Sequence, residues 1–174
     1  KTLLSALDEE GSLLDLRDVL LKNDSKKVGL LGSNLVELLL YSKMAHECNP
    51  DIETVAILDA NSMNYINAKE FYHVFKDTIN RVYFVNMARP MNAFKEIFEG
   101  EQNTTFDAII NLEDVKGSET VAALLVKPKG FMYHTGVKRN LFHSILAVDC
   151  IGKEVNIHSL DGYANGVFDF AVEL

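Results

Sequence analysis

The histidines are the first residues to consider as metal ligands or general bases, and their spacing argues against a shared site. No HxH or HExxH pattern joins them, and they fall in different predicted elements, at His46, His73, His134, His143 and His158. Zinc sites need ligands that a helix or a turn brings together. The sequence therefore predicts no metal site.

The candidate nucleophiles and acids lack the sequence context that catalysis requires. Ser144 and Ser159 have no nucleophile-elbow sequence, and no GxxxxGK[ST] phosphate loop occurs in the chain. Asp149, Glu154 and Asp161 lie near predicted strand ends, where a solvated loop accounts for acidic residues without an acid–base role. The sequence therefore identifies no catalytic residue, and it lacks the motifs that hydrolase and NTPase activities require.

Composition and charge exclude several other classes. The chain has 174 residues, 48% of them hydrophobic, and a net charge of −8 without any basic block, which disfavours nucleic acids and anionic membrane surfaces. No apolar run approaches the ~20 residues that span a bilayer, and the first residues lack the features of a secretory signal, so we expect a cytoplasmic protein. Cys48 and Cys150 lie far apart without a CxxC pattern, which predicts reduced thiols.

The elements that position the remaining polar residues follow from hydrophobic periodicity. Strands are expected at 28–32, 54–59, 82–86, 106–111, 130–134 and 154–158, and helices at 13–21, 35–47, 67–77, 90–99, 118–126, 141–148 and from 167 onward. Six apolar runs separated by helices indicate right-handed crossovers and a parallel sheet that is covered on both faces. We predict an α/β, Rossmann-like, doubly wound six-stranded sheet of order 3-2-1-4-5-6. Residues 1–25 would form an N-terminal helical lead-in, and 26–174 the Rossmann-like domain.

Ligands of such sheets lie outside the carboxyl ends of the strands, where the strand order reverses. Gly32, Ser33 and Asn34 follow the first predicted strand, so the next helix offers its free N–H groups to a pyrophosphate there, unless Ser33 or Asn34 caps them. Asp59 ends the second strand, where a carboxylate accepts hydrogen bonds from the ribose of NAD, although a solvated turn also explains it. Asn86 and Asn111 end strands three and four, and they either line the same crevice or form Asx turns.

Beyond the general Rossmann pattern, the chain resembles one particular family. Residues 151–166, IGKEVNIHSLDGYANG, match a Gly-Lys-Asp-Val segment that leads into Gly-Tyr and a further Gly, and Ile110, Asn111, Val115 and Glu119 match further positions. These segments resemble the nucleotide-binding domain of L-erythro-3,5-diaminohexanoate dehydrogenase, an NAD(P)-dependent enzyme of lysine fermentation related in architecture to medium-chain dehydrogenases. The resemblance implies a dinucleotide cofactor and places Gly162 and Tyr163 near the cofactor end of the sheet, and the Asp59 carboxylate, which would repel the extra phosphate of NADP, favours NAD.

The chain also departs from that family. The family's glycine-rich turn, laid on this chain without gaps, places its glycines at Gly32, Leu35 and Leu38, so two are replaced, and Glu37 adds a negative charge to the first helical turn. The family's substrate domain lies outside these residues, so we expect no hydride transfer by the chain alone.

Three functions remain open at this point. The first is a dinucleotide-binding domain of an oxidoreductase. The second is a non-catalytic descendant that serves in the assembly or regulation of an amino-acid fermentation enzyme, with a protein partner or as a homo-oligomer formed through an edge strand. The third is a small-molecule methyltransferase, although its usual antiparallel seventh strand has no counterpart in the sequence.

Overall fold

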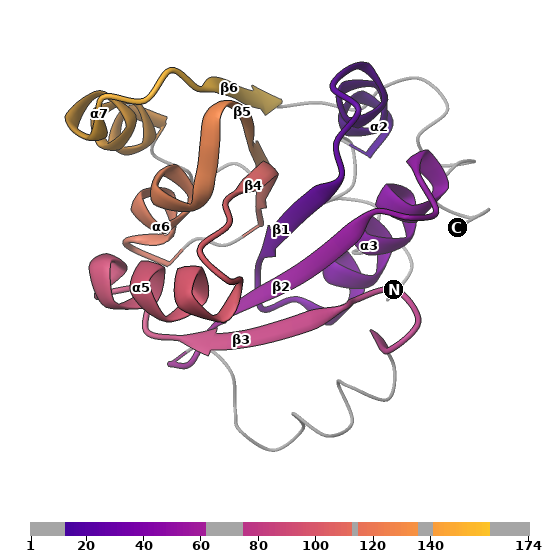
Figure 1. Cartoon of the computed structure of the whole chain (residues 1–174), viewed down its shortest axis with the longest axis horizontal. Helices are drawn as coiled ribbons and strands as arrows, with labels where there is room; N and C mark the ends of the chain where they lie inside the picture. The colour runs from indigo at the N-terminus through magenta and orange to yellow at the C-terminus, as the bar shows by residue number, and fades with distance from the viewer. Residues whose placement is uncertain (1–12, 62–74, 113–114, 136–140, 161–174) are drawn as a thin grey trace, which may run out of the picture.

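The computed structural model describes residues 13–61, 75–112, 115–135 and 141–160. Within these residues one parallel sheet has the order β3-β2-β1-β4-β5-β6, which confirms the predicted fold class and strand order (Figure 1). The strands are β1 (Lys27–Leu31), β2 (Glu53–Asp59), β3 (Arg81–Val85), β4 (Phe106–Asn111), β5 (Val126–Thr135) and β6 (Asn156–Leu160).

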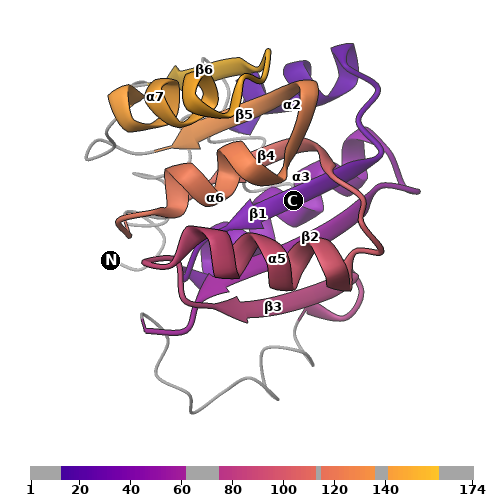
Figure 2. The same ribbon diagram turned by 60° about the vertical axis from the view of Figure 1, so that its left-hand side comes forward.

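Helices cover both faces of this sheet. They are α2 (Leu13–Lys22), α3 (Leu35–Cys48), α5 (Pro90–Gly100), α6 (Ser118–Leu125) and α7 (Leu141–Ile151). Figures 1 and 2 show α2 and α3 on one face and α5, α6 and α7 on the other. The helix predicted at 67–77 falls mostly outside the described residues, and the one predicted from 167 falls wholly outside them. None of the described helices is both long enough and apolar enough to span a membrane.

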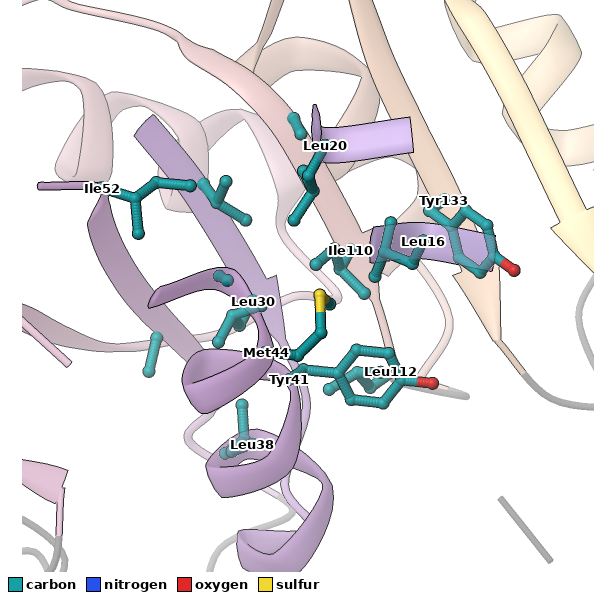
Figure 3. Packing of buried hydrophobic residues seen from close by; sticks show 14 of the residues in the cluster. Leu16, Leu20, Leu30, Leu38, Tyr41, Met44, Ile52, Ile110, Leu112 and Tyr133 are labelled. Atoms are coloured by element: carbon teal, nitrogen blue, oxygen red, sulfur yellow. The ribbon is translucent and has the colours of Figure 1, made fainter. Parts of the chain in front are cut away.

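The apolar core lies in two layers, one on each face of the sheet. On the α2–α3 face, one buried cluster includes Leu16 and Leu20 of α2, Leu38 and Met44 of α3, and Tyr133 of β5 (Figure 3). On the other face, the buried side chains of α5 and α6 pack on β1, β2, β4 and β5. Because the central strands β1, β2 and β4 are buried on both faces, they carry no polar alternation, as their apolar runs in the sequence predict.

A buried ion cluster fixes the amino edge of the sheet. The Glu101 side chain, just after α5, has no exposed surface and accepts hydrogen bonds from Lys27 Nζ at 2.6 Å, Arg81 Nη1 at 3.0 Å and Tyr83 Oη at 2.6 Å. Burial by itself would raise the pKa of this carboxyl, but the bonds from Lys27 and Tyr83 outweigh it and lower the pKa below the usual 4.5. The cluster ties the end of α5 to the first residues of β1 and β3.

A lysine fixes the connection between α7 and β6. Lys153 Nζ donates to three carbonyl oxygens at the end of α6 and the start of β5: Ala123 at 3.1 Å, Leu124 at 2.6 Å and Val126 at 2.6 Å. Partial burial lowers the pKa of this ammonium. Cations near a helix C-terminus satisfy its last carbonyls and favour its dipole, so Lys153 acts as the cap of α6.

Three of the described elements have a boundary that differs from the prediction by more than one residue. β5 begins at Val126 rather than at residue 130, β6 lies two residues later than predicted, and α7 continues to Ile151. After the buried Val126, residues 127–129 of β5 are exposed, and the β4–β5 register is irregular there. Exposure and irregular pairing remove the apolar signal from which strand boundaries are predicted.

Candidate functional site

The carboxyl ends of the strands gather the residues that the sequence analysis selected. Leu31, just before Gly32, pairs with Ile57 on one side and Asn111 on the other, and Asp59 pairs with Val85, next to Asn86. Gly32, Ser33, Asn34, Asp59, Asn86 and Asn111 therefore share one edge of the sheet, as predicted for a crevice at the reversal of strand order. Gly162 and Tyr163 lie outside the described residues.

Gly32 is required by packing within the sheet. A Cβ atom on Gly32 would lie 2.9 Å from Leu112 Cβ, closer than non-bonded carbon atoms pack in proteins. The Gly32 N–H donates to Ile57 O at 3.2 Å, and the Leu112 N–H donates to Leu31 O at 2.6 Å. The contact between the chain after β1 and the chain after β4 thus explains this glycine without a ligand.

Asn34 is the N-cap of α3. Its backbone is extended, and its Oδ1 accepts a hydrogen bond from the Val36 N–H at 3.0 Å. This is the capping interpretation of the turn, and it occupies one of the N–H groups that a pyrophosphate would use. Ser33 is half-buried beside it, Leu38 is fully buried in the core on the α2–α3 face, and the Leu35 side chain is outside the described part of the structure.

The Asp59 carboxylate bonds to the loop after β3. Its Oδ1 accepts a hydrogen bond from the Met87 N–H at 3.0 Å and lies 3.4 Å from Asn61 Nδ2, and only 1% of the residue is exposed. Charge-assisted bonds of this kind are among the stronger hydrogen bonds in proteins. Asp59 therefore holds the 86–88 loop against the end of β2.

The two asparagines also bond within the protein. Asn86 Oδ1 accepts from the Ala88 N–H at 3.0 Å, which is the Asx turn considered for this position, and this turn leads into Pro90 at the start of α5. Asn111 is fully buried, and its amide donates to Ser118 Oγ at 3.1 Å in the first turn of α6. Both side chains position the loops that follow their strands.

A buried polar pair that the sequence did not indicate lies beside Asn111. His134 of β5 pairs in register with Asn111, and its Nε2 lies 3.0 Å from Ser144 Oγ of α7. Both His134 and Ser144 are fully buried. No spacing rule joins residues that are ten apart on a strand and a helix, so sequence patterns carry no signal for this contact.

The loops at this edge are packed tightly on one another. Gly117, the N-cap of α6, has a φ of 102°, and a Cβ there would lie 2.2 Å from the Met87 carbonyl oxygen. Only glycine accommodates both the left-handed backbone and this contact. Met87 is thus fixed from two sides, by Asp59 through its N–H and by Gly117 against its carbonyl.

The Cys48 thiol shows no sign of activation. Cys48 and Cys150 are both free, and burial raises the pKa of the Cys48 thiol to about 11. A reactive cysteine needs the opposite shift, toward the thiolate. Across the described ranges of the chain, no group of three or more His, Cys, Asp and Glu side chains could hold a metal ion.

The side chains at this edge do not fit a dinucleotide held in the usual way. When the general fingerprint Gly-x-Gly-x-x-Gly is counted from Gly32, its second and third glycine positions are occupied by Asn34 and Glu37. Glu37 is 8% exposed, so a buried carboxylate stands in the first turn of α3, where a pyrophosphate would need positive potential. Asp59, the expected ribose acceptor, is already bonded to Met87.

Comparisons with known proteins identify the fold. No family model matches the sequence, and no curated protein matches it. Solved structures do match, among them D-arabinose dehydrogenase from Sulfolobus solfataricus, with a TM-score of 0.62 and 11% identity over 97% of this chain and 48% of that one. An Escherichia coli oxidoreductase of unknown specificity has a TM-score of 0.62 and 16% identity, over 96% of this chain and 44% of that one.

A third match was solved with ligands bound. Glucose dehydrogenase from Haloferax mediterranei, in complex with NADP, Zn and gluconolactone, has a TM-score of 0.61 and 8% identity, over 97% of this chain and 46% of that one. The chain therefore has the Rossmann-type fold found in zinc-binding and related dehydrogenases. It spans slightly less than half the length of these three proteins.

Proposed function

We propose that this chain is a Rossmann domain of the dehydrogenase type, resembling that of 3,5-diaminohexanoate dehydrogenase, which serves as a non-catalytic module for the assembly or regulation of an amino-acid fermentation enzyme. The bond between the Asp59 carboxylate and the Met87 N–H carries the proposal. This carboxylate is the group expected to receive the ribose, and it is engaged within the protein and buried.

A dinucleotide would have to compete with that bond. Turning Asp59 toward a ribose would leave the buried Met87 N–H without its acceptor, at a cost of about 1–3 kcal/mol. That cost would weaken binding by about 5- to 150-fold relative to a crevice whose carboxylate is free to reorient. The Asn34 cap on α3 adds a second competing bond at the pyrophosphate position.

The surface of α7 supports a role in assembly. Phe142, Ile145 and Leu146 are exposed by 64%, 54% and 43%, although a helix that only covers a sheet usually turns polar side chains to solvent. The neighbouring β6 is the edge of the sheet within the described residues, and edge strands readily pair with another chain. A second copy of the chain is the partner proposed here.

Calorimetric titration with NADH, NADPH and S-adenosylmethionine tests the proposal, and sedimentation equilibrium tests self-association. We expect no heat of binding from any ligand at millimolar concentration, and a dimer that the exposed-face variant Phe142→Asp/Ile145→Asp converts to a folded monomer. Asp149→Asn, an exposed change on the same helix, is the matched control.

A dinucleotide-binding domain is the second candidate, because Gly32 keeps the turn after β1 free of a side chain. Micromolar binding of NADH that Asp59→Asn weakens would establish that function instead, with Gly32, Ser33 and Asn34 under the pyrophosphate. Binding of S-adenosylmethionine alone would favour a methyltransferase. Either result would overturn the non-catalytic module.

A further inference from the structure

The first turn of α3 holds a carboxylate where a nucleotide-binding helix would receive a phosphate. We infer that Glu37 is a built-in anion for the N-terminus of α3 and that, together with the Asn34 cap, it excludes pyrophosphate groups from this turn. The inference rests on the proposed function, and it names the residues that close the crevice at the phosphate position.

The geometry of the turn supplies the first argument. The first N–H groups of a helix have no partner within the helix and attract anions. Here Asn34 Oδ1 accepts the Val36 N–H at 3.0 Å, and Asn34 O accepts the Leu38 N–H at 3.0 Å, which closes the first turn of the helix. A side-chain oxygen of the protein thus takes the place of one phosphate oxygen.

The position and burial of Glu37 supply the second argument. Glu37 lies three residues after the N-cap, the spacing at which a glutamate of a capping box serves the amino end of its own helix. A negative charge there is favoured by the helix dipole, and the 8% exposure of Glu37 limits its screening by salt. The same charge repels a second anion brought to the same N–H groups.

The two replaced positions act together. In the fingerprint, the residue two after the first glycine lets the backbone approach a pyrophosphate, and the residue five after it lets the helix pack closely on the strand. Asn34 and Glu37 occupy these positions, as the N-cap and a first-turn residue of α3. On this inference, the chain's own side chains offset the positive potential at the amino end of α3.

The test measures anion binding by the whole chain and by variants of this turn. Inorganic pyrophosphate, ADP and NADH are titrated calorimetrically into the wild type, Glu37→Gln and Asn34→Gly/Glu37→Gly. Glu47→Gln removes the same charge from an exposed position near the other end of α3 and is the matched control. Glu37→Gln keeps the size of the side chain, so it tests the charge even if the double glycine variant folds poorly.

We expect Glu37→Gln to bind pyrophosphate and ADP at least about tenfold more tightly than the wild type, and the double variant more tightly still. We also expect Glu37→Gln to lower Tm by about 2–4 °C, because the helix loses its internal anion. Glu47→Gln should leave anion binding unchanged, and it should not lower Tm, because it removes a negative charge from the C-terminal end of the helix, where the dipole disfavours it.

The failures of the two proposals are distinguishable. A wild type that binds no nucleotide, with folded Glu37→Gln and double variants that bind neither pyrophosphate nor ADP, would overturn this inference and leave the proposed function standing. A wild type that binds NADH, with binding that Glu37→Gln strengthens tenfold, would overturn the proposed function alone. NADH binding that Glu37→Gln leaves unchanged would overturn both.

Discussion

Replacing Asp59 by alanine tests whether its carboxylate stabilises the fold or serves only to bind a ligand. In the folded chain Asp59 Oδ1 accepts the Met87 N–H at 3.0 Å, and the residue is 1% exposed. Alanine removes the acceptor and leaves a buried donor, so the variant should lose stability in the absence of any ligand. A carboxylate whose only role is to bind a ribose would contribute little to the stability of the ligand-free protein.

The size of the loss follows from the kind of bond. A hydrogen bond to a charged group contributes about 1.5–3 kcal/mol, and in a chain of this length each kcal/mol shifts Tm by about 2–4 °C. We therefore expect Asp59→Ala to lower Tm by about 3–12 °C, measured by differential scanning calorimetry without nucleotide. Asp59→Asn, which keeps an acceptor oxygen, should lose less than half as much.

Asp77→Ala is the matched control, since Asp77 is an exposed aspartate just before β3, and its Tm should stay within about 1 °C of the wild type. An Asp59→Ala variant as stable as this control would refute the structural role of the carboxylate. That result would instead favour the hypothesis that Asp59 binds a ribose.

Three further substitutions test the fold around the site. Glu101→Gln should lower the free energy of unfolding by about 3 kcal/mol, measured by urea denaturation at neutral pH. The pKa of Glu101 in the folded protein is below its ordinary 4.5, so this stabilisation is present above pH 4.5 and is lost as the pH falls through the folded value. The difference in stability between the wild type and the variant should therefore disappear in acid. Gly117→Ala should cost about 1–3 kcal/mol or more, since its Cβ would meet the Met87 carbonyl oxygen, whereas Gly152→Ala, also at a positive φ but with nothing within 4 Å, should cost about 1 kcal/mol. Lys153→Met should lower the free energy of unfolding by about 1–3 kcal/mol, and an unchanged urea midpoint would contradict its role as the cap of α6.

The strand order was predictable because the central strands β1, β2 and β4 are buried on both faces, and because crossovers between parallel strands are almost always right-handed. These two facts leave a distinct apolar run for each of these strands and few ways to arrange them. The boundaries that were missed lie where burial changes, at the exposed residues 127–129 of β5 and in the turn before β6. An edge or an exposed strand end carries no apolar pattern to detect.

The local contacts of the site were predictable, and the distant ones were not. Asn34 and Asn86 bond to N–H groups two residues away, and these bonds follow from residue type and position alone. The Asp59–Met87 bond spans 28 residues and depends on how the loop after β3 returns across the sheet. The burial of Glu37 likewise depends on how α3 lies on the sheet, so the sequence showed its charge but not its surroundings.

Lys153 has a consequence for the slow motions of the sheet. Edge strands are usually among the first elements to fray, and frayed edges are where aggregation begins. In this chain, separation of β6 from β5 would also pull the Lys153 ammonium away from the carbonyl oxygens of Ala123, Leu124 and Val126. Opening of the edge is therefore coupled to loosening of the last turn of α6, and the amides of both elements should exchange with solvent as one cooperative unit.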